Sequence, residues 1–176
     1  MTESIDTGLP YPKSVIEFLT VSAEFCKLME TCAQTEASDF AKQASILLTM
    51  LYLKVQFISE DFDSEGFNED FVTEEDYNFV RQNVSTVLGP ADDYLTTNVE
   101  DFKFSDQPVL HTVSEDLADL YQVMRNLIEV VRNGYEDAIR AALSDTLEQY
   151  RYFWGRVLLN ALTALHPVAT QEESFD

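Results

Sequence analysis

Apolar residues recur every three to four positions over most of the chain, which is the spacing that places them on one face of an α-helix. No segment alternates between apolar and polar residues for long enough to predict a β-strand. The helices predicted from these apolar stripes run over about 14–31, 38–58, 73–88, 112–131 and 135–165. Because each stripe needs a neighbour to cover it, the sequence predicts an all-α bundle of five major helices.

Short polar signals mark several ends of these predicted helices. Ser14 followed by Glu17, and Thr73 followed by Asp76, have the spacing of a capping box, in which the two side chains satisfy free amides of the first turn. Gly89 predicts the end of the third helix, since glycine adopts the conformation that commonly closes a helix. These signals place the helix ends more closely than the apolar stripes alone.

Two connections between the predicted helices are unusual. Segment 60–76 holds nine carboxylates and no Lys or Arg, together with Phe62, Phe67 and Phe71. We expect an acidic loop whose phenylalanines either cover the bundle or dock a basic partner. Segment 91–109 has weak periodicity, so we expect a connection with one short helix, long enough to be a functional or flexible loop.

The charge of the chain narrows the classes of partner. Its 32 Asp and Glu residues stand against 11 Lys and Arg residues, which gives a formal net charge of −21. Nucleic acids and anionic membrane surfaces would repel such a chain, so we expect neither as a partner. Two explanations of the acidity stay open, which are solubility alone and the capture of a protein with a basic face.

Length and cysteine content predict one intracellular domain. We expect a single helical domain over residues 1–176, with flexible tails at 1–12 and 168–176. The N-terminus lacks the pattern of a secretory signal, and no apolar run approaches the roughly 20 residues of a membrane span. Cys26 and Cys32 fall on different faces of one predicted helix, where we expect reduced core thiols and hence a cytoplasmic protein.

Two C-terminal segments resemble a known bacterial family. Residues 116–122 read D-L-A-D-L-Y-Q, and residues 152–166 read Y-F-W-G-R-V-L-L-N-A-L-T-A-L-H. Together with V-I-E-F at 15–18 and A-E-F at 23–25, these segments look like the helical family catalogued as domain of unknown function 5063. The resemblance implies an all-α fold and a bacterial, cytoplasmic protein, and it brings no known activity with it.

Four carboxylates form the sharpest enzymatic pattern. Asp116 and Asp119 are three residues apart on one predicted helix, and Asp145 and Glu148 are three apart on the next. Such pairs share a helix face, and four of them are able to hold Mg²⁺ for the hydrolysis of a nucleotide. Acid-rich helices also produce such pairs by chance, and we favour that interpretation of a solvated face.

A candidate recognition surface comes from the family-like residues. It comprises Tyr121, Gln122, Trp154 and His166, which are residue types found where proteins bind one another. Trp154 also fits the core, and His166 fits a structural place at the end of the last helix. Gly155, beside Trp154, is expected to allow a close helix approach rather than a break.

The sequence thus leaves two functional hypotheses and no established activity. The leading hypothesis is a cytoplasmic helical module that binds a protein with a basic face and needs no cofactor. The alternative is a Mg²⁺-dependent nucleotide hydrolase that uses Asp116, Asp119, Asp145 and Glu148. Whether the protein is an enzyme stays open at this point.

Overall fold

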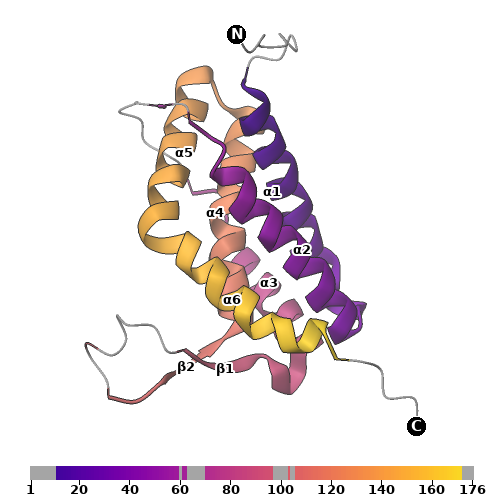
Figure 1. The fold of residues 1–176 in the computed structure, drawn as a ribbon. Helices are drawn as coiled ribbons and strands as arrows, with labels where there is room; N and C mark the ends of the chain where they lie inside the picture. The colour runs from indigo at the N-terminus through magenta and orange to yellow at the C-terminus, as the bar shows by residue number, and fades with distance from the viewer. Residues whose placement is uncertain (1–10, 60, 63–69, 97–102, 104–105, 172–176) are drawn as a thin grey trace.

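The computed structural model describes residues 11–59, 61–62, 70–96, 103 and 106–171, and these residues fold mainly into α-helices (Figure 1). Their elements, in chain order, are α1 (Lys13–Thr31), α2 (Ala37–Val55), α3 (Glu74–Leu88), β1 (Asp93–Thr96), β2 (Val109–Thr112), α4 (Val113–Asn133), α5 (Glu136–Gln149) and α6 (Gly155–Ala169). Short 3₁₀ turns follow α1 and α3, and a π-helical turn at Tyr150–Trp154 joins α5 to α6. The predicted all-α bundle is confirmed.

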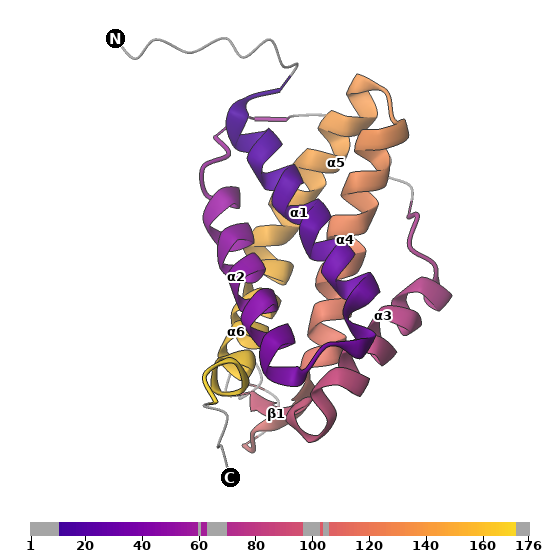
Figure 2. The ribbon, with the colours of Figure 1, turned by 90° about the vertical axis from the view of Figure 1, so that its right-hand side faces the viewer.

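Helix α4 is the central element of the bundle. It contacts α1, α3, α5 and α6, while α2 packs against α1 and α6. The β-hairpin lies at the end of the bundle opposite the turn between α4 and α5 (Figures 1 and 2). The largest side chains without exposed surface include Trp154, Phe18, Phe25, Phe40 and Met29. Burial of each such side chain stabilises the fold by roughly 1.5–3 kcal/mol, so this core accounts for the packing of the helices.

One of the two predicted capping boxes is present. The Thr73 hydroxyl accepts a hydrogen bond from the Asp76 amide at 3.1 Å, and the Asp76 carboxylate accepts one from the Thr73 amide at 3.0 Å. The capping box predicted at Ser14 is wrong, because α1 already begins at Lys13 and has no side-chain cap. Its other member, Glu17, instead accepts a hydrogen bond from Lys54 of α2 at 2.8 Å.

The connection between α3 and α4 contains two strands, so the prediction of no strand is wrong. Strands β1 and β2 pair antiparallel, with Tyr94 opposite His111 and Leu95 opposite Leu110. Each strand has four residues, which is too few for an alternating pattern to stand out in the sequence. Much of segment 91–109, where one short helix was predicted, lies outside the described residues. A 3₁₀ turn at Gly89–Ala91 leads into it and begins at the positive φ of Gly89 (52°).

Buried Asp92 joins the base of this hairpin to α4. Its two carboxylate oxygens accept hydrogen bonds from the amide and the hydroxyl of Ser114, each at 2.7 Å. The Thr112 hydroxyl accepts a further bond from the Glu115 amide. The hairpin therefore completes the N-terminal cap of α4.

The predicted long last helix is interrupted by the π-helical turn. Gly155 ends this turn, where an added Cβ would lie 2.5 Å from the Tyr150 carbonyl oxygen and 2.9 Å from its ring. The closest approach at this glycine is therefore to the preceding turn of its own helix. Downstream, α6 continues through Pro167 to Ala169, four residues beyond the predicted end.

The structure tests part of the predicted C-terminal tail and the prediction of two core thiols. Residues 1–10 and 172–176 lie outside the described part of the chain, but Val168 is buried in α6 and so does not belong to a tail. Cys26 and Cys32 are free and buried, as predicted. Among the described helices, none combines the length and the apolar character that crossing a membrane requires.

Candidate functional site

Two carboxylates of the family-like segment bind tyrosines from two neighbouring elements. Asp116 accepts a hydrogen bond from the Tyr94 hydroxyl of β1, and Asp119 accepts one from the Tyr77 hydroxyl of α3 at 2.9 Å. Because the two aspartates are one helical turn apart, the face of α4 that they share fastens both α3 and the hairpin. The Asp-x-x-Asp spacing is therefore explained by polar contacts within the fold.

Burial changes the protonation of both aspartates. Burial raises the pKa of Asp116 to about 6, although the hydrogen bond from Tyr94 and the nearby His111 oppose the rise. Burial also raises the pKa of Asp119, and there the hydrogen bond from Tyr77 opposes it. These carboxyl groups are consequently easier to protonate than exposed ones.

The four carboxylates of the predicted magnesium site do not come together. Asp116 lies beneath the hairpin with 6% of its surface exposed, Glu148 is exposed on α5, and Asp119 and Asp145 line one pocket. Within the described part of the chain, no group of three or more Asp, Glu, His or Cys residues is arranged to hold a metal ion. The prediction of converging carboxylates fails because the hydrogen bond to Tyr94 keeps Asp116 at the hairpin.

The pocket between α4 and α5 has a volume of about 150 Å³, and we call it the acidic pocket. Its apolar lining comes from both helices and from Phe153 of the π-helical turn, and the helix residues are Val123, Leu127, Val130 and Ala142. Its polar lining consists of Thr146 and a set of carboxylates and amides, which are Asp70, Asp119, Asp145, Gln122, Asn126 and Gln149. An apolar floor with polar groups at fixed places is the usual construction of a binding pocket.

The three carboxylates of the acidic pocket have neutral hydrogen-bond donors. Asp145 accepts a hydrogen bond from Gln149 at 2.7 Å, and Asp70 accepts one from Asn126 at 3.2 Å. Asp119 has the Tyr77 hydroxyl. No basic residue occurs among the described residues that line the pocket, and the ion pairs found in the described chain do not include these three carboxylates. The pocket therefore has a negative potential, which no basic residue among its described lining residues compensates.

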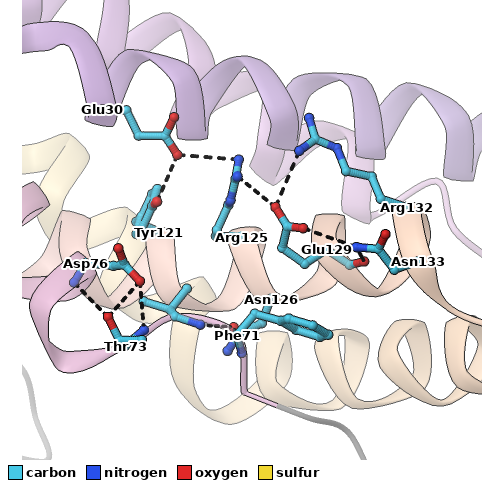
Figure 3. A network of polar contacts seen from close by, with 11 residues as sticks. Glu30, Phe71, Thr73, Asp76, Tyr121, Arg125, Asn126, Glu129, Arg132 and Asn133 are labelled. Carbon is cyan, nitrogen blue, oxygen red and sulfur yellow. Dashed lines mark hydrogen bonds and ion pairs between the residues drawn. The ribbon is translucent and has the colours of Figure 1, made fainter.

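A polar network on the adjacent face of α4 joins α1 to the segment before α3 (Figure 3). Arg125 contacts Glu129 at 2.7 Å and Glu30 of α1 at 3.4 Å, and Glu30 also accepts a hydrogen bond from Tyr121 at 2.8 Å. The next residue of α4 is Asn126, and its side-chain oxygen accepts hydrogen bonds from the amides of residues 71 and 72. Arg125 is thus paired with two carboxylates, whereas the three carboxylates of the acidic pocket take part in none of the identified ion pairs.

The described ends of the acidic segment pack against the bundle. Phe62 is buried, with the Arg140 guanidinium 5.6 Å from the centre of its ring. Phe71 is half exposed, and Asn126 holds its backbone amide at 2.8 Å. Phe67 lies outside the described residues. Of the two interpretations of this segment, covering of the bundle applies to Phe62.

The predicted recognition surface is not one surface. Trp154 is fully buried, and its indole donates a hydrogen bond to the Thr146 carbonyl at 2.8 Å. Tyr121 is buried against α1, Gln122 lines the acidic pocket, and His166 lies exposed near the end of α6 beside α2. Trp154 lies in the core, whereas Tyr121, Gln122 and His166 lie at α1, at the acidic pocket and beside α2, so the four residues do not form one surface.

The comparison with known proteins decides the family. A family model described as a domain of unknown function, DUF5063, matches residues 10–171. The chain belongs to this family. The structure is similar to the crystal structure of protein BF1032 from Bacteroides fragilis, with 32% sequence identity, a TM-score of 0.78, and coverage of 92% of this chain and 98% of that one. A search of curated proteins found no match.

The DUF5063 chain has pocket residues that the sequence did not reveal. Asp70, Asn126 and Gln149 come from three separate segments, and no local spacing connects them. Gln149 lies four residues after Asp145, a helical spacing that would have indicated a contact between the two. Asp70 and Asn126 meet only through a tertiary contact, in which the end of the acidic segment packs against α4.

Proposed function

We propose that this DUF5063 chain binds another protein by accepting an arginine or lysine side chain of that partner in the acidic pocket. The observation that supports this proposal is that Asp70, Asp119 and Asp145 line one pocket, and that its described lining residues include no basic residue. A cationic group that enters would form charge-assisted hydrogen bonds with carboxylate oxygens, which are stronger than bonds between neutral groups.

The size of the acidic pocket supports a side chain rather than a nucleotide. A cavity of about 150 Å³ accommodates a group about as large as a benzene ring. A guanidinium or ammonium group is of this size, and the alkyl stem of Arg or Lys would lie along apolar residues such as Val123 and Leu127. A polyphosphate would instead meet three carboxylates, so the pocket gives no support to nucleotide hydrolysis.

The wider setting of the protein is also part of the proposal. We propose a bacterial source and a cytoplasmic location. The similarity to a Bacteroides fragilis protein supports the source. The free buried thiols of Cys26 and Cys32 support a reducing compartment.

A titration with a minimal cation tests the proposed binding. N-acetyl-arginine N-methylamide would be added to the ¹⁵N-labelled protein, with the neutral citrulline analogue as the matched probe. We expect amide shifts that cluster at Gln122, Asp145 and Gln149 with the arginine probe alone. Added salt is expected to weaken the shifts, because ions screen partly exposed charges.

Two variants of equal charge make the test specific. Asp145→Asn removes one carboxylate from the pocket and is expected to weaken binding of the arginine probe about tenfold, the equivalent of one charge-assisted hydrogen bond. Asp137→Asn removes an exposed carboxylate near the start of α5 that does not line the pocket, so binding should be unchanged. Equal binding of the citrulline probe, or equal loss in both variants, would overturn the proposal.

A further inference from the structure

The side of α2 that faces away from the core, together with the turn that follows the helix, carries four large apolar residues. Ile46, Met50, Leu53 and Phe57 expose 60%, 37%, 49% and 62% of their surface, and we call them the outer stripe. The core face of the same helix is formed by other residues, which are Phe40, Ala41, Ala44, Leu48, Leu51 and Val55. A helix that is apolar on both sides normally has both sides covered.

The charge around the outer stripe favours a second copy of the same chain. Two molecules that each carry a net charge of −21 repel one another over most of their surface. From 40 to 59, however, the sequence contains no Asp or Glu, and its charged residues are Lys42 and Lys54. Helix α2 lies on the outside of the bundle beside α6 (Figure 2), so this surface, which has no carboxylate of its own, is open to a partner.

The spacing of the outer stripe is the same when read in either direction. Its members are separated by four, three and four residues, the alternation that packs one helix along another. In an antiparallel pair related by a two-fold axis, Ile46 of one copy lies opposite Phe57 of the other, and Met50 lies opposite Leu53. Such self-complementarity is the condition for a symmetric dimer interface, in which each contact occurs twice.

A groove next to Ile46 has room for the aromatic ring of Phe57 from the second copy. The groove lies between α2 and α6, has a volume of about 670 Å³, and is lined in part by Ile46, Leu162 and Ala169. Phe57 follows the last turn of α2 and is the most exposed member of the outer stripe. The antiparallel arrangement places Phe57 of the second copy at this groove.

From the stripe, the charge and the groove, we infer that two copies of this chain form an antiparallel dimer through the outer faces of their α2 helices. The dimer surface is separate from the acidic pocket between α4 and α5, so each is testable without the other. Outside the interface, the acidic surfaces of the two molecules repel each other, and moderate salt strengthens the dimer because it screens this repulsion. The same salt weakens binding of a cation in the acidic pocket, because it screens that attraction.

The mass of the full chain in solution tests this inference. Analytical ultracentrifugation over about a thousandfold range of concentration is expected to show a monomer–dimer equilibrium. Leu53→Glu places two carboxylates, one from each copy, at the centre of the interface and should weaken the dimer at least about a hundredfold. Leu110→Glu, at a residue of the hairpin that is 63% exposed, adds the same charge elsewhere and should leave the dimer intact.

The outcomes against the dimer are distinct. A chain that stays monomeric over this range, or a dimer that Leu110→Glu disrupts and Leu53→Glu does not, overturns the inference. Circular dichroism of both variants checks folding. Since Leu53 is half exposed, its variant should melt close to the native protein.

Disulfide formation between differently tagged chains tests the antiparallel register. A mixture of Met50→Cys and Leu53→Cys chains should form the mixed disulfide fastest, because a disulfide requires Cβ atoms about 3.8 Å apart. Faster formation of both symmetric disulfides would indicate parallel helices and overturn the register. The native thiols do not compete, because burial raises the pKa of Cys26 to about 12 and that of Cys32 to about 11.

Discussion

The Tyr94 hydroxyl of β1 donates a hydrogen bond to the carboxylate of Asp116, the first acidic residue of the D-L-A-D-L-Y-Q segment on α4. The bond lies beneath the hairpin, where Asp116 is 6% exposed and the ring of His111 packs 5.9 Å from that of Tyr94. A carboxylate so placed loses most of its hydration, and the tyrosine replaces only part of it. The contact therefore makes the docking of the hairpin sensitive to pH.

Asp116→Asn should reduce the dependence of stability on pH. The pKa of Asp116 in the folded protein is about 6, above that of an exposed aspartate, so the folded state binds the proton more tightly than the unfolded state. Its contribution to stability is full below about pH 4 and is lost as the pH rises through about 6. At pH 7.5 the variant should be more stable than the native protein, by up to about 3 kcal/mol.

Urea unfolding at a series of pH values measures this difference. Asp137→Asn is the matched control, since it removes an exposed carboxylate and should leave the slope between pH 4 and 6 unchanged. A slope in Asp116→Asn equal to that of the control would contradict the assigned pKa.

Tyr77→Phe should destabilise the protein by about 1–2 kcal/mol, because a half-buried carboxylate loses a hydrogen-bond donor. The pKa of Asp119 should rise further, since the bond from Tyr77 lowers it in the native protein. Carbon-detected NMR titration of the Asp119 carboxyl measures the pKa. Tyr135→Phe changes a tyrosine that is 86% exposed and is expected to alter neither quantity.

Asn126→Ala should release the end of the acidic segment. Its side-chain oxygen accepts hydrogen bonds from the amides of Phe71 and Val72 at 2.8 and 2.9 Å, so both amides should exchange with solvent faster in the variant. Hydrogen exchange followed by NMR gives the rates. Asn133→Ala serves as the control, because the Asn133 amide contacts only Glu129 of its own helix among its identified bonds. Unchanged exchange at both amides would show that other contacts hold the segment.

Gly155→Ala should destabilise the protein by about 1–3 kcal/mol, because the new methyl group would lie 2.5 Å from the Tyr150 carbonyl oxygen. The higher helix propensity of alanine offsets at most about 1 kcal/mol of this cost. Trp154 is the single tryptophan and is fully buried, so its fluorescence should shift to longer wavelength if the π-helical turn rearranges. A higher melting temperature with unchanged fluorescence would contradict the clash.

Magnesium at millimolar concentration should leave the melting temperature unchanged. Ligands that bind the folded state raise its stability, and among the described residues no group of three or more Asp, Glu, His or Cys residues is arranged to hold a metal ion. Calorimetry with and without MgCl₂, at matched ionic strength, measures the effect. A rise that Asp145→Asn abolishes would restore the magnesium hypothesis.

The helices were predictable from sequence because each has a long apolar stripe that repeats with the helical period. The capping box at Thr73 was also predictable, since both of its partners lie within four residues. The hairpin was not, because four-residue strands carry too little alternation to separate them from a loop. The capping box at Ser14 was predicted wrongly for another reason. Helix α1 already begins at Lys13, and Glu17 accepts a hydrogen bond from Lys54 of another helix.

The candidate site was predictable only in part. The spacing of Asp116 and Asp119 correctly indicated a shared helix face, but their tyrosine partners are 22 and 42 residues away along the chain. Asp145 was found by the same reasoning, whereas Asp70 reaches the acidic pocket through a tertiary contact with Asn126. Residue type and spacing therefore identified the acids but not the groups that they face.

The π-helical turn at Tyr150–Trp154 also affects how this chain can vary in length. A π-helical turn holds one residue more than an α-helical turn, so deletion of one residue from it, such as exposed Tyr152, should leave a regular α-helix with the faces of α5 and α6 in register. A one-residue deletion within α6 has no surplus residue to remove, and because each residue rotates an α-helix by about 100°, it would turn the residues beyond it away from the core. The turn is therefore the place where this pair of helices should best tolerate the loss of one residue.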